Sequence, residues 1–274
     1  MNESRKMFRK GKLMRCRNLC LATLVLVAGL TLSACSEMGA FEKRQEISKT
    51  FDIKSGGSIT VENTNGSITA EGWDQDKVEV VAIKTAHGYD NRDAEENLNR
   101  LEVVFDTSGN NLRIETRYPH RMGFGGGVQY TLRVPRKIGL DLRSTNGHVE
   151  AGDVEGQIRL GTTNGSIKAE NIGGSLRGST TNGKITATFT RYAGDGIRLS
   201  TTNGSVQLSL PDDVDANLSA HTTNGSVRTD FPITTQGVLG KHSLEGKLGK
   251  GGPVIELRTT NGSISITRSS HQTV

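Results

Sequence analysis

Apolar and polar residues alternate along most of this 274-residue chain, and the alternation keeps its phase around a tripeptide, Thr-Asn-Gly, that occurs seven times. Counted from each asparagine, the residue six places earlier is always aliphatic and the residue three places later is always β-branched. A period of two is that of a β-strand with one buried face, so each unit predicts a strand, an Asn-Gly turn and a second strand. The turn residues are Asn65 and Gly66, Asn146 and Gly147, Asn164 and Gly165, Asn182 and Gly183, Asn203 and Gly204, Asn224 and Gly225, and Asn261 and Gly262.

The spacing of the tripeptides predicts a repeat architecture. Successive asparagines are 81, 18, 18, 21, 21 and 37 residues apart, so the long gaps are close to multiples of a unit of 18 to 21 residues. Such units can stack as parallel rungs of an all-β solenoid, or each can close a type I′ hairpin in an antiparallel β-meander or barrel. The near-identity of the units favours the β-solenoid, because stacking places like residues above like. We expect the Asn amides and Thr hydroxyls of the turns to be buried and to form a structural ladder of hydrogen bonds between rungs.

Residues 1–34 predict a targeting segment. Seven Lys or Arg side chains among the first 17 residues precede an apolar run from Leu19 to Leu32, which is too short to span a bilayer. The run ends in Leu32-Ser33-Ala34-Cys35, which resembles the lipobox of bacterial lipoproteins. The resemblance implies cleavage before Cys35, diacylglycerol on its sulfur and acylation of its amine, so that lipid holds the protein to a membrane. It also implies sorting to the outer membrane, because Ser36 and not Asp follows the cysteine.

The rest of the chain predicts one folded domain between two polar segments. Residues 35–49 lack periodicity and predict the lipidated cysteine and a tether, the β-strand-repeat domain spans 50–268, and 269–274 form a polar tail. One helix is expected between Asp90 and Leu101, docked on the strands. The Gly- and Lys-rich stretch 234–252 interrupts the repeats, and we expect either a degenerate rung or a loop suited to binding.

The basic charge of the chain belongs mainly to the leader. The whole sequence carries 34 Lys and Arg against 29 Asp and Glu, but the leader removes seven bases and one acid. The mature chain is left with 27 bases and 28 acids and with no basic cluster among aromatic residues, so no nucleic-acid partner is expected. Cys16 and Cys20 also lie in the leader, which leaves Cys35 as the single cysteine of the mature chain.

Candidate catalytic and metal-ligating side chains are scattered. The six histidines lack the spacing of a metal site, and His148 occupies a position where most units place Ser on the solvent side of a strand. Asp212, Asp213 and Asp215 lack the glycine and distal glutamate of a calcium loop, so they predict a solvated turn. The glycine-rich loop from Met122 to Gly127 has no Lys-Ser/Thr end and precedes a strand, which argues against phosphate binding. We therefore predict a protein that is not an enzyme and has no metal or cofactor.

Taken together, these motifs resemble a known family. A lipobox, strands with a helical insert, and then a series of Thr-Thr-Asn-Gly-Ser-Ile/Val units are similar to the DUF4097 family of bacterial β-strand-repeat proteins, over roughly Thr50 to Thr267. The resemblance implies a β-solenoid in the cell envelope, and members of the family are labelled adhesins by inference. No family catalytic residues can be carried over.

The predicted function is a lipid-anchored envelope protein with a non-catalytic role in binding or adhesion, toward an unknown protein or glycan partner. Two alternatives remain open. A polysaccharide-acting β-helix enzyme would need paired carboxylates on one face, whereas the acids here are scattered, aromatic residues are 4% of the chain and Trp73 is the one Trp. A periplasmic accessory to envelope-stress signalling would have no exposure at the cell surface.

Overall fold

The computed structural model describes residues 41–119, 125–192, 196–234 and 240–269. The expected leader, Cys35, most of the glycine-rich loop before residue 126, and residues 270–274 of the expected tail lie outside the described residues. The described residues form 19 strands and one helix, so the prediction of a mostly β chain is confirmed. No helix among them is long and apolar enough to cross a membrane.

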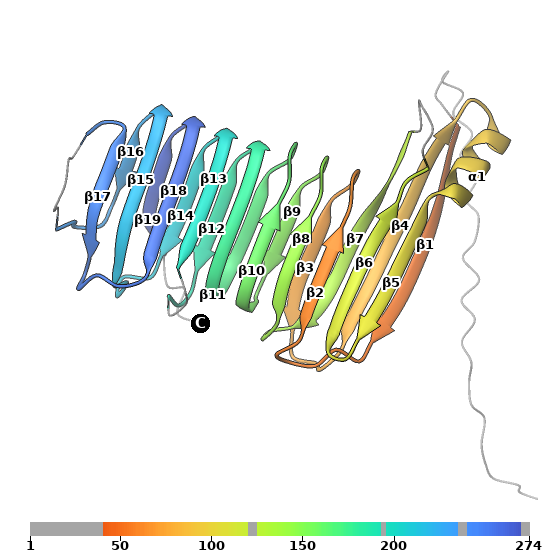
Figure 1. The fold of residues 1–274 in the computed structure, drawn as a ribbon, viewed down its shortest axis with the longest axis horizontal. Coiled ribbons are helices and arrows are strands. Elements are labelled where there is room, and N and C mark those ends of the chain that lie inside the picture. Colours follow the sequence, from red (N-terminus) through yellow and green to blue (C-terminus); the bar gives the residue numbers. More distant parts are fainter. Residues whose placement is uncertain (1–40, 120–124, 193–195, 235–239, 270–274) are drawn as a thin grey trace, which may run out of the picture. The chain divides into compact units, whose positions relative to one another are not determined.

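The strands form two faces of a curled, β-solenoid-like sheet, which we call sheet A and sheet B (Figure 1). The long strand β11 (Ile167–Asn182) contributes its first part to sheet A and its second part to sheet B. In spatial order, sheet A otherwise contains β1 (Phe41–Phe51), β4 (Val78–Gly88), β7 (Gly126–Pro135), β3 (Ile68–Trp73), β9 (Val149–Gly152), then β12 (Ile185–Phe189), β14 (Val206–Leu210), β19 (Ile264–Arg268) and β16 (Val227–Thr229). Sheet B contains β5 (Glu102–Ser108), β6 (Asn111–Arg117), β2 (Ser58–Glu62), β8 (Gly139–Arg143), β10 (Glu155–Gly161), then β13 (Ile197–Asn203), β18 (Val254–Asn261), β15 (Ala216–Asn224) and β17 (Ser243–Leu248).

Each unit runs from a strand of sheet B through the Asn-Gly turn into a strand of sheet A. The two strands of a unit do not pair with each other as a hairpin would; they pair in parallel with the same strands of the neighbouring units. The register aligns equivalent positions, so Ile158 is the partner of Leu140 on one side and of Leu176 on the other. Antiparallel pairs occur toward the two ends of the stack, where β1 pairs with β4, β4 with β7, β5 with β6, and β15 with β17.

The order of the units in space differs from their order in the chain. The first unit, β2 and β3, lies between β6–β7 and β8–β9. The last unit, β18 and β19, lies between β13–β14 and β15–β16. The gap of 37 residues before the last tripeptide is therefore the path that brings the chain back into the stack, by way of β17. Stacking in chain order, which a simple solenoid implies, does not hold at either end.

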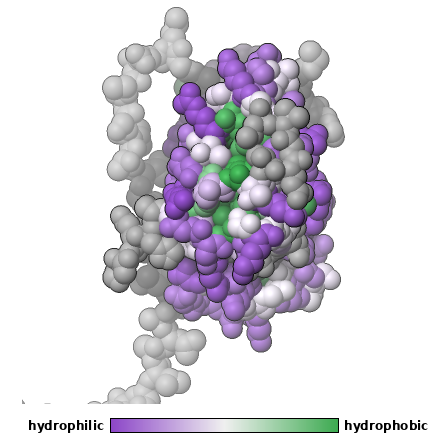
Figure 2. Space-filling model, turned by 90° about the vertical axis from the view of Figure 1, so that its left-hand side faces the viewer, coloured by the Kyte–Doolittle hydropathy of each residue, from purple (hydrophilic) through white to green (hydrophobic). Residues whose placement is uncertain are grey.

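The alternating pattern places one set of apolar side chains between the two sheets. The aliphatic residue six places before each turn asparagine is buried in all seven units, as Ile59, Leu140, Ile158, Leu176, Ile197, Leu218 and Ile255. Viewed from the end of the stack where β15, β16 and β17 lie, apolar residues occupy the middle and polar residues flank them on both sides (Figure 2). Burial of this shared core holds the units together, because no unit has enough apolar surface to be stable alone.

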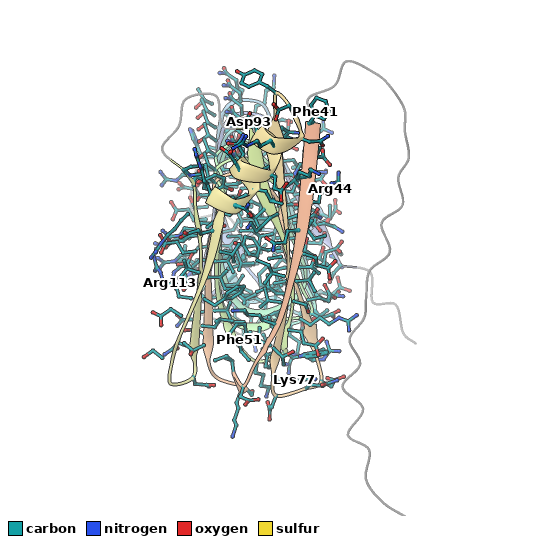
Figure 3. The ribbon with its side chains drawn as sticks, turned by 90° about the vertical axis from the view of Figure 1, so that its right-hand side faces the viewer. Phe41, Arg44, Phe51, Lys77, Asp93 and Arg113 are labelled. Atoms are coloured by element: carbon teal, nitrogen blue, oxygen red, sulfur yellow. The ribbon has the colours of Figure 1, made fainter. Side chains whose placement is uncertain are left out.

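The opposite end of the stack is covered by β1, β5 and α1 (Asn91–Arg100), as Figure 3 shows. The helix lies where the sequence predicts it, with Oδ1 of Asp90 accepting a 2.8 Å hydrogen bond from the backbone N–H of Asp93. The rings of Phe51 and Phe105 lie 5.5 Å apart between β1 and β5. This end is thus closed by a helix and by aromatic contacts.

The prediction that residues 35–49 form a tether is wrong from residue 41 onward. Residues 41–51 form β1, an edge strand that pairs with β4 along its whole length. Its side chains are mostly exposed on both faces, and the strand is held by its backbone pairing, so it shows no alternation of apolar and polar residues.

Candidate functional site

The seven turn asparagines form a single row along one corner of the stack. Six of them donate a hydrogen bond from the side-chain Nδ2 to Oδ1 of an asparagine in a neighbouring unit, and Asn65, at one end of the row, donates to the carbonyl oxygen of Gly126 instead. The donor and acceptor pairs are Asn146 and Asn65, Asn164 and Asn146, Asn182 and Asn164, Asn203 and Asn182, and Asn261 and Asn203, each at 2.8 Å, and Asn224 and Asn261 at 2.9 Å.

The turn glycines are required by close approach between units. A Cβ added to Gly183 would lie 1.9 Å from the carbonyl oxygen of Gly165 in the neighbouring unit. Six of the seven turn glycines have no positive φ, and neither do the turn asparagines, so the corner is not the type I′ turn of the hairpin alternative.

The buried hydroxyls of the corner are not those of the Thr-Asn-Gly tripeptides. Thr181, like the other tripeptide threonines, is exposed, and the asparagine amides lie at the surface, which corrects the expectation that both are buried. The buried residue is the one just before the tripeptide: Thr180 donates a 2.9 Å hydrogen bond from Oγ1 to the carbonyl oxygen of Gly165. In the first unit Asn63 takes this place, and its Nδ2 donates to the carbonyl of Val128 at 2.7 Å. The whole corner is therefore occupied by bonds between units.

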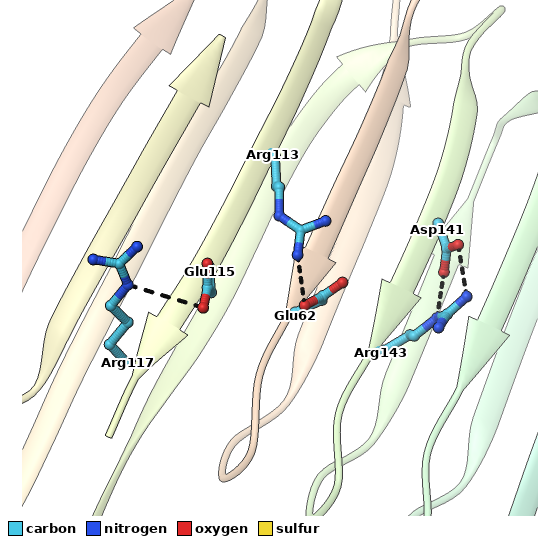
Figure 4. A network of polar contacts seen from close by, with 6 residues as sticks. All are labelled: Glu62, Arg113, Glu115, Arg117, Asp141 and Arg143. Atoms are coloured by element: carbon cyan, nitrogen blue, oxygen red, sulfur yellow. Dashed lines mark hydrogen bonds and ion pairs between the residues drawn. The ribbon is translucent and has the colours of Figure 1, made fainter. Parts of the chain in front are cut away.

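The outer face of sheet B carries a field of charged residues. At its β6–β8 side the arginines have carboxylate partners on the same face (Figure 4). Arg113 lies 2.9 Å from Glu62, Arg117 lies 3.9 Å from Glu115, and Arg143 donates hydrogen bonds of 2.8 and 2.9 Å to Asp141. The Asp141 carboxylate raises the pKa of Arg143 above its usual value. This part of the face is neutralised internally.

The next three strands of sheet B carry a row of arginines at one register position. Arg159, Arg177 and Arg198 are direct cross-strand partners on β10, β11 and β13, and all three are exposed. Among the described residues, neither Arg159 nor Arg177 makes an ion pair, and Arg198 lies 3.4 Å from Glu256, which also binds Arg258 at 2.8 Å. We call Arg159, Arg177 and Arg198 the arginine row. The sequence contains a signal for the row, because each arginine stands five residues before a turn asparagine, but the pattern of apolar positions does not reveal it.

Two shallow grooves lie along the arginine row. One, of about 360 Å³, passes over the small residues Gly161, Ser179 and Ser200. The other, of about 230 Å³, is lined by Gln157, Ser175 and Val254 among others. All three arginines line both grooves, so the row forms a ridge of positive charge between two hollows, of which the smaller has mainly polar walls and the larger mainly apolar walls with serine hydroxyls among them.

An acidic group lies at the end of several sheet A strands. Burial raises the pKa of Glu71, and a hydrogen bond with Asp153 and the charges of Asp153 and Glu170 raise it further. Arg136 partly offsets this, with its guanidinium 2.7 Å from Asp74 and 3.7 Å from Asp153. This group is a charged cluster on the surface of the stack.

The candidate metal-ligating residues of the sequence do not come together. Nδ1 of His148 lies 2.8 Å from Oγ of Ser166, Asp212 lies 3.2 Å from Arg268, and Asp215 accepts a hydrogen bond from the backbone of Lys250. Within the described ranges, no group of three or more His, Cys, Asp and Glu side chains could hold a metal ion. Cys35 lies outside those ranges.

One protein family and several solved structures are similar to this chain. A family model described as Toastrack DUF4097 matches residues 57–267. A search of curated proteins gives no match. Among solved structures, a putative cell adhesion protein from Clostridium sporogenes is 13% identical, covers 83% of this chain and 100% of its own, and has a TM-score of 0.50. A putative adhesin from Bacteroides fragilis is 10% identical over 82% of this chain and 97% of its own, with a TM-score of 0.39. A putative lipid binding protein from Parabacteroides distasonis is 11% identical over the same shares, with a TM-score of 0.26. At 13% identity, the similarity to the Clostridium sporogenes structure shows a shared fold and nothing more.

Proposed function

The chain belongs to the DUF4097 family, and we propose that it is a lipid-anchored protein of the cell envelope with a non-catalytic role in binding or adhesion. The observation that carries the proposal is the use of the repeated motif. In the six units after the first, the asparagine bonds to an asparagine, the turn glycine packs against a glycine carbonyl of the neighbouring unit, and the buried hydroxyl bonds to the same carbonyl. The repeated residues therefore stabilise the stacking of the units. The outer faces of the two sheets remain as long polar surfaces suited to a partner.

The anchor is proposed from the leader and the lipobox residues before Cys35. A single acyl chain binds a membrane only marginally, whereas the two or more chains of a bacterial lipoprotein hold it stably. The proposed partner is a protein or a glycan of an envelope or of a neighbouring surface. The putative cell adhesion protein from Clostridium sporogenes has a similar fold, and the role in its name agrees with this proposal.

The test of the anchor is Cys35→Ser, with Cys20→Ser in the leader as the matched control. We expect the wild type and the Cys20→Ser chain to fractionate with membranes, to need detergent for release and to incorporate a labelled fatty acid. Cys35→Ser is expected to lose the label and to leave the membrane fraction. Incorporation of the label by the Cys35→Ser chain would overturn the anchor.

The test of the role uses purified full-length protein and isolated cell-envelope fractions. We expect saturable binding to a glycan or protein fraction without turnover of the ligand. Turnover of an envelope glycan that disappears on substitution of one carboxylate would overturn the non-catalytic role and favour an enzyme. Protease treatment of intact cells distinguishes the surface role, in which the domain is digested, from a periplasmic accessory, in which it is protected.

A further inference from the structure

The arginine row is costly for the fold if nothing binds to it. Arg159, Arg177 and Arg198 are direct neighbours across parallel strands, and like charges opposite one another destabilise a sheet. At the β6–β8 side of the same face, Arg113, Arg117 and Arg143 are each balanced by a carboxylate. Asp141, the cross-strand neighbour of Arg159 on β8, is bonded to Arg143, and no described carboxylate makes an ion pair with Arg159 or Arg177. A bound anion would therefore supply a partner that the protein itself does not.

The geometry of the row specifies a repeating ligand. Neighbouring strands lie about 4.8 Å apart, so the three guanidinium-bearing positions are evenly spaced over about 10 Å along the stack. A guanidinium binds carboxylate or phosphate through two parallel hydrogen bonds, and it remains charged at any physiological pH. A linear polymer with an acidic group in its repeating unit can follow such a row, whereas a single small anion would use one arginine.

The side chains that line the grooves indicate which class of polymer binds there. The hydroxyls of Ser175, Ser179 and Ser200 and the amide of Gln157 flank the row, and they suit the hydroxyl groups of a sugar chain. The residues lining these two grooves include no aromatic side chain, which a single-stranded nucleic acid would need for base stacking. The mature chain also has slightly more acids than bases, so it offers no broad basic field beyond this row.

We propose that the outer face of sheet B from β10 to β13 binds a linear polysaccharide with a carboxylate or phosphate in its repeating unit, through Arg159, Arg177 and Arg198. This proposal rests on the proposed envelope-binding function and assigns it a surface and a ligand class. The small residues Gly161, Ser179 and Ser200 leave room for the chain beside the guanidinium groups.

The test compares two double variants that remove the same charge from the same face. Arg159→Gln with Arg177→Gln removes the two arginines without a carboxylate partner, and Arg113→Gln with Arg117→Gln removes two that have one. Binding of full-length protein in detergent is measured to polygalacturonate, to a phosphomannan and to neutral dextran, over a range of salt concentrations. Polygalacturonate and phosphomannan distinguish carboxylate from phosphate as the recognised group. Circular dichroism shows whether both variants keep the β fold of the wild type.

We expect wild-type protein to bind at least one of the acidic polysaccharides and not dextran. The first double variant should bind at least about tenfold more weakly, because it loses two charge-assisted contacts. Its log–log salt dependence should become shallower by up to about two units. The Arg113→Gln, Arg117→Gln control should bind as the wild type does.

Four outcomes would overturn the proposal. Equal weakening in both variants would show a general charge effect, and tighter Arg159- and Arg177-dependent binding of single-stranded DNA would identify another ligand class. Binding to envelope fractions that both variants retain would place the site elsewhere and leave the proposed function standing. If the wild type binds no envelope fraction at all, the proposed function fails together with this inference.

Discussion

Asn182 donates a 2.8 Å hydrogen bond from Nδ2 to Oδ1 of Asn164, which stands 18 residues earlier in the chain and one unit away in the stack. Its own Oδ1 accepts an equal bond from Asn203. Each amide in the middle of the row is therefore both donor and acceptor, an arrangement in which neighbouring hydrogen bonds polarise one another. A side-chain row of this kind fixes the register of the units, because a shift by one residue would break all of its bonds at once.

Replacing Asn182 with Ala should lower the free energy of unfolding by about 1 kcal/mol, because the freed groups of Asn164 and Asn203 remain accessible to water. The matched control is Thr181→Ala, which changes the exposed residue beside it. Urea unfolding followed by circular dichroism measures both. Equal midpoints for the two variants would show that the row does not contribute to stability.

Gly183→Ala should be more damaging, with a loss of more than about 2 kcal/mol, because the new Cβ would lie 1.9 Å from the Gly165 carbonyl oxygen. Gly161→Ala is the control, since its Cβ would meet Arg143 Cγ at 3.7 Å, an ordinary contact. Thermal unfolding of both chains tests this. A Gly183→Ala chain as stable as Gly161→Ala would mean that the corners can separate without cost.

Thr180→Val keeps the shape of the side chain and removes the hydroxyl that donates to the Gly165 carbonyl. Because this site is buried, we expect a loss of about 1–2 kcal/mol in the free energy of unfolding. Thr181→Val makes the same chemical change at an exposed position and should have little effect. The prediction fails if the two variants unfold at the same urea concentration.

Glu71 should make stability depend on pH. Its pKa is raised in the folded protein by burial and by Asp153, so the folded state holds this proton more tightly than the unfolded state does. Stability is therefore favoured below the usual Glu pKa of 4.5 and falls as the pH rises through the higher folded pKa. We expect Glu71→Gln to unfold at a higher temperature than the wild type at pH 7 and to show a smaller difference at pH 4. Glu150→Gln, on the adjacent strand β9, should not show this gain, and an equal gain in both would point to net charge alone.

A chain that ends after residue 232 should lose folded structure well beyond the residues that are removed. It lacks β18 and β19, which lie between β13–β14 and β15–β16, so the last retained unit has no partner to stack on. We expect β13 to β16 to become sensitive to protease, whereas a chain ending after residue 269 should resist it. Protection of β15 in the shorter chain would show that the units can close the gap.

Much of the stack could be predicted from the sequence because it depends on local periodicity. The alternation identified the buried set, such as Ile158 and Ile167, and the capping residue Asp90 identified the helix. Strand β1 could not be predicted, because an edge strand held by backbone pairing needs no alternating side chains. The position of β18 between β13 and β15 could not be predicted either, because units with nearly the same sequence fit equally well in several orders.

The exposure of the turn asparagines could not be predicted from the sequence either. A polar residue repeated in every unit can bond between units from inside or from outside the corner, and only the path of the backbone decides which. Here the buried place goes to Thr180 and its equivalents, and the amides bond at the surface. The arginine row differs, since Arg159, Arg177 and Arg198 share one repeat position and a search of the polar positions by unit would have found it.

The late insertion of β18 and β19 has a consequence for how the protein matures. A polypeptide is synthesised from its amino end, so these two strands are made after every other described strand, yet they lie in the interior of the row of units. The growing end cannot simply lengthen by one layer at a time, and a place must stay open until the final segment arrives. The same arrangement limits how such a protein can gain length over generations, because an extra copy added at the carboxyl terminus would find no vacant neighbour to lie on.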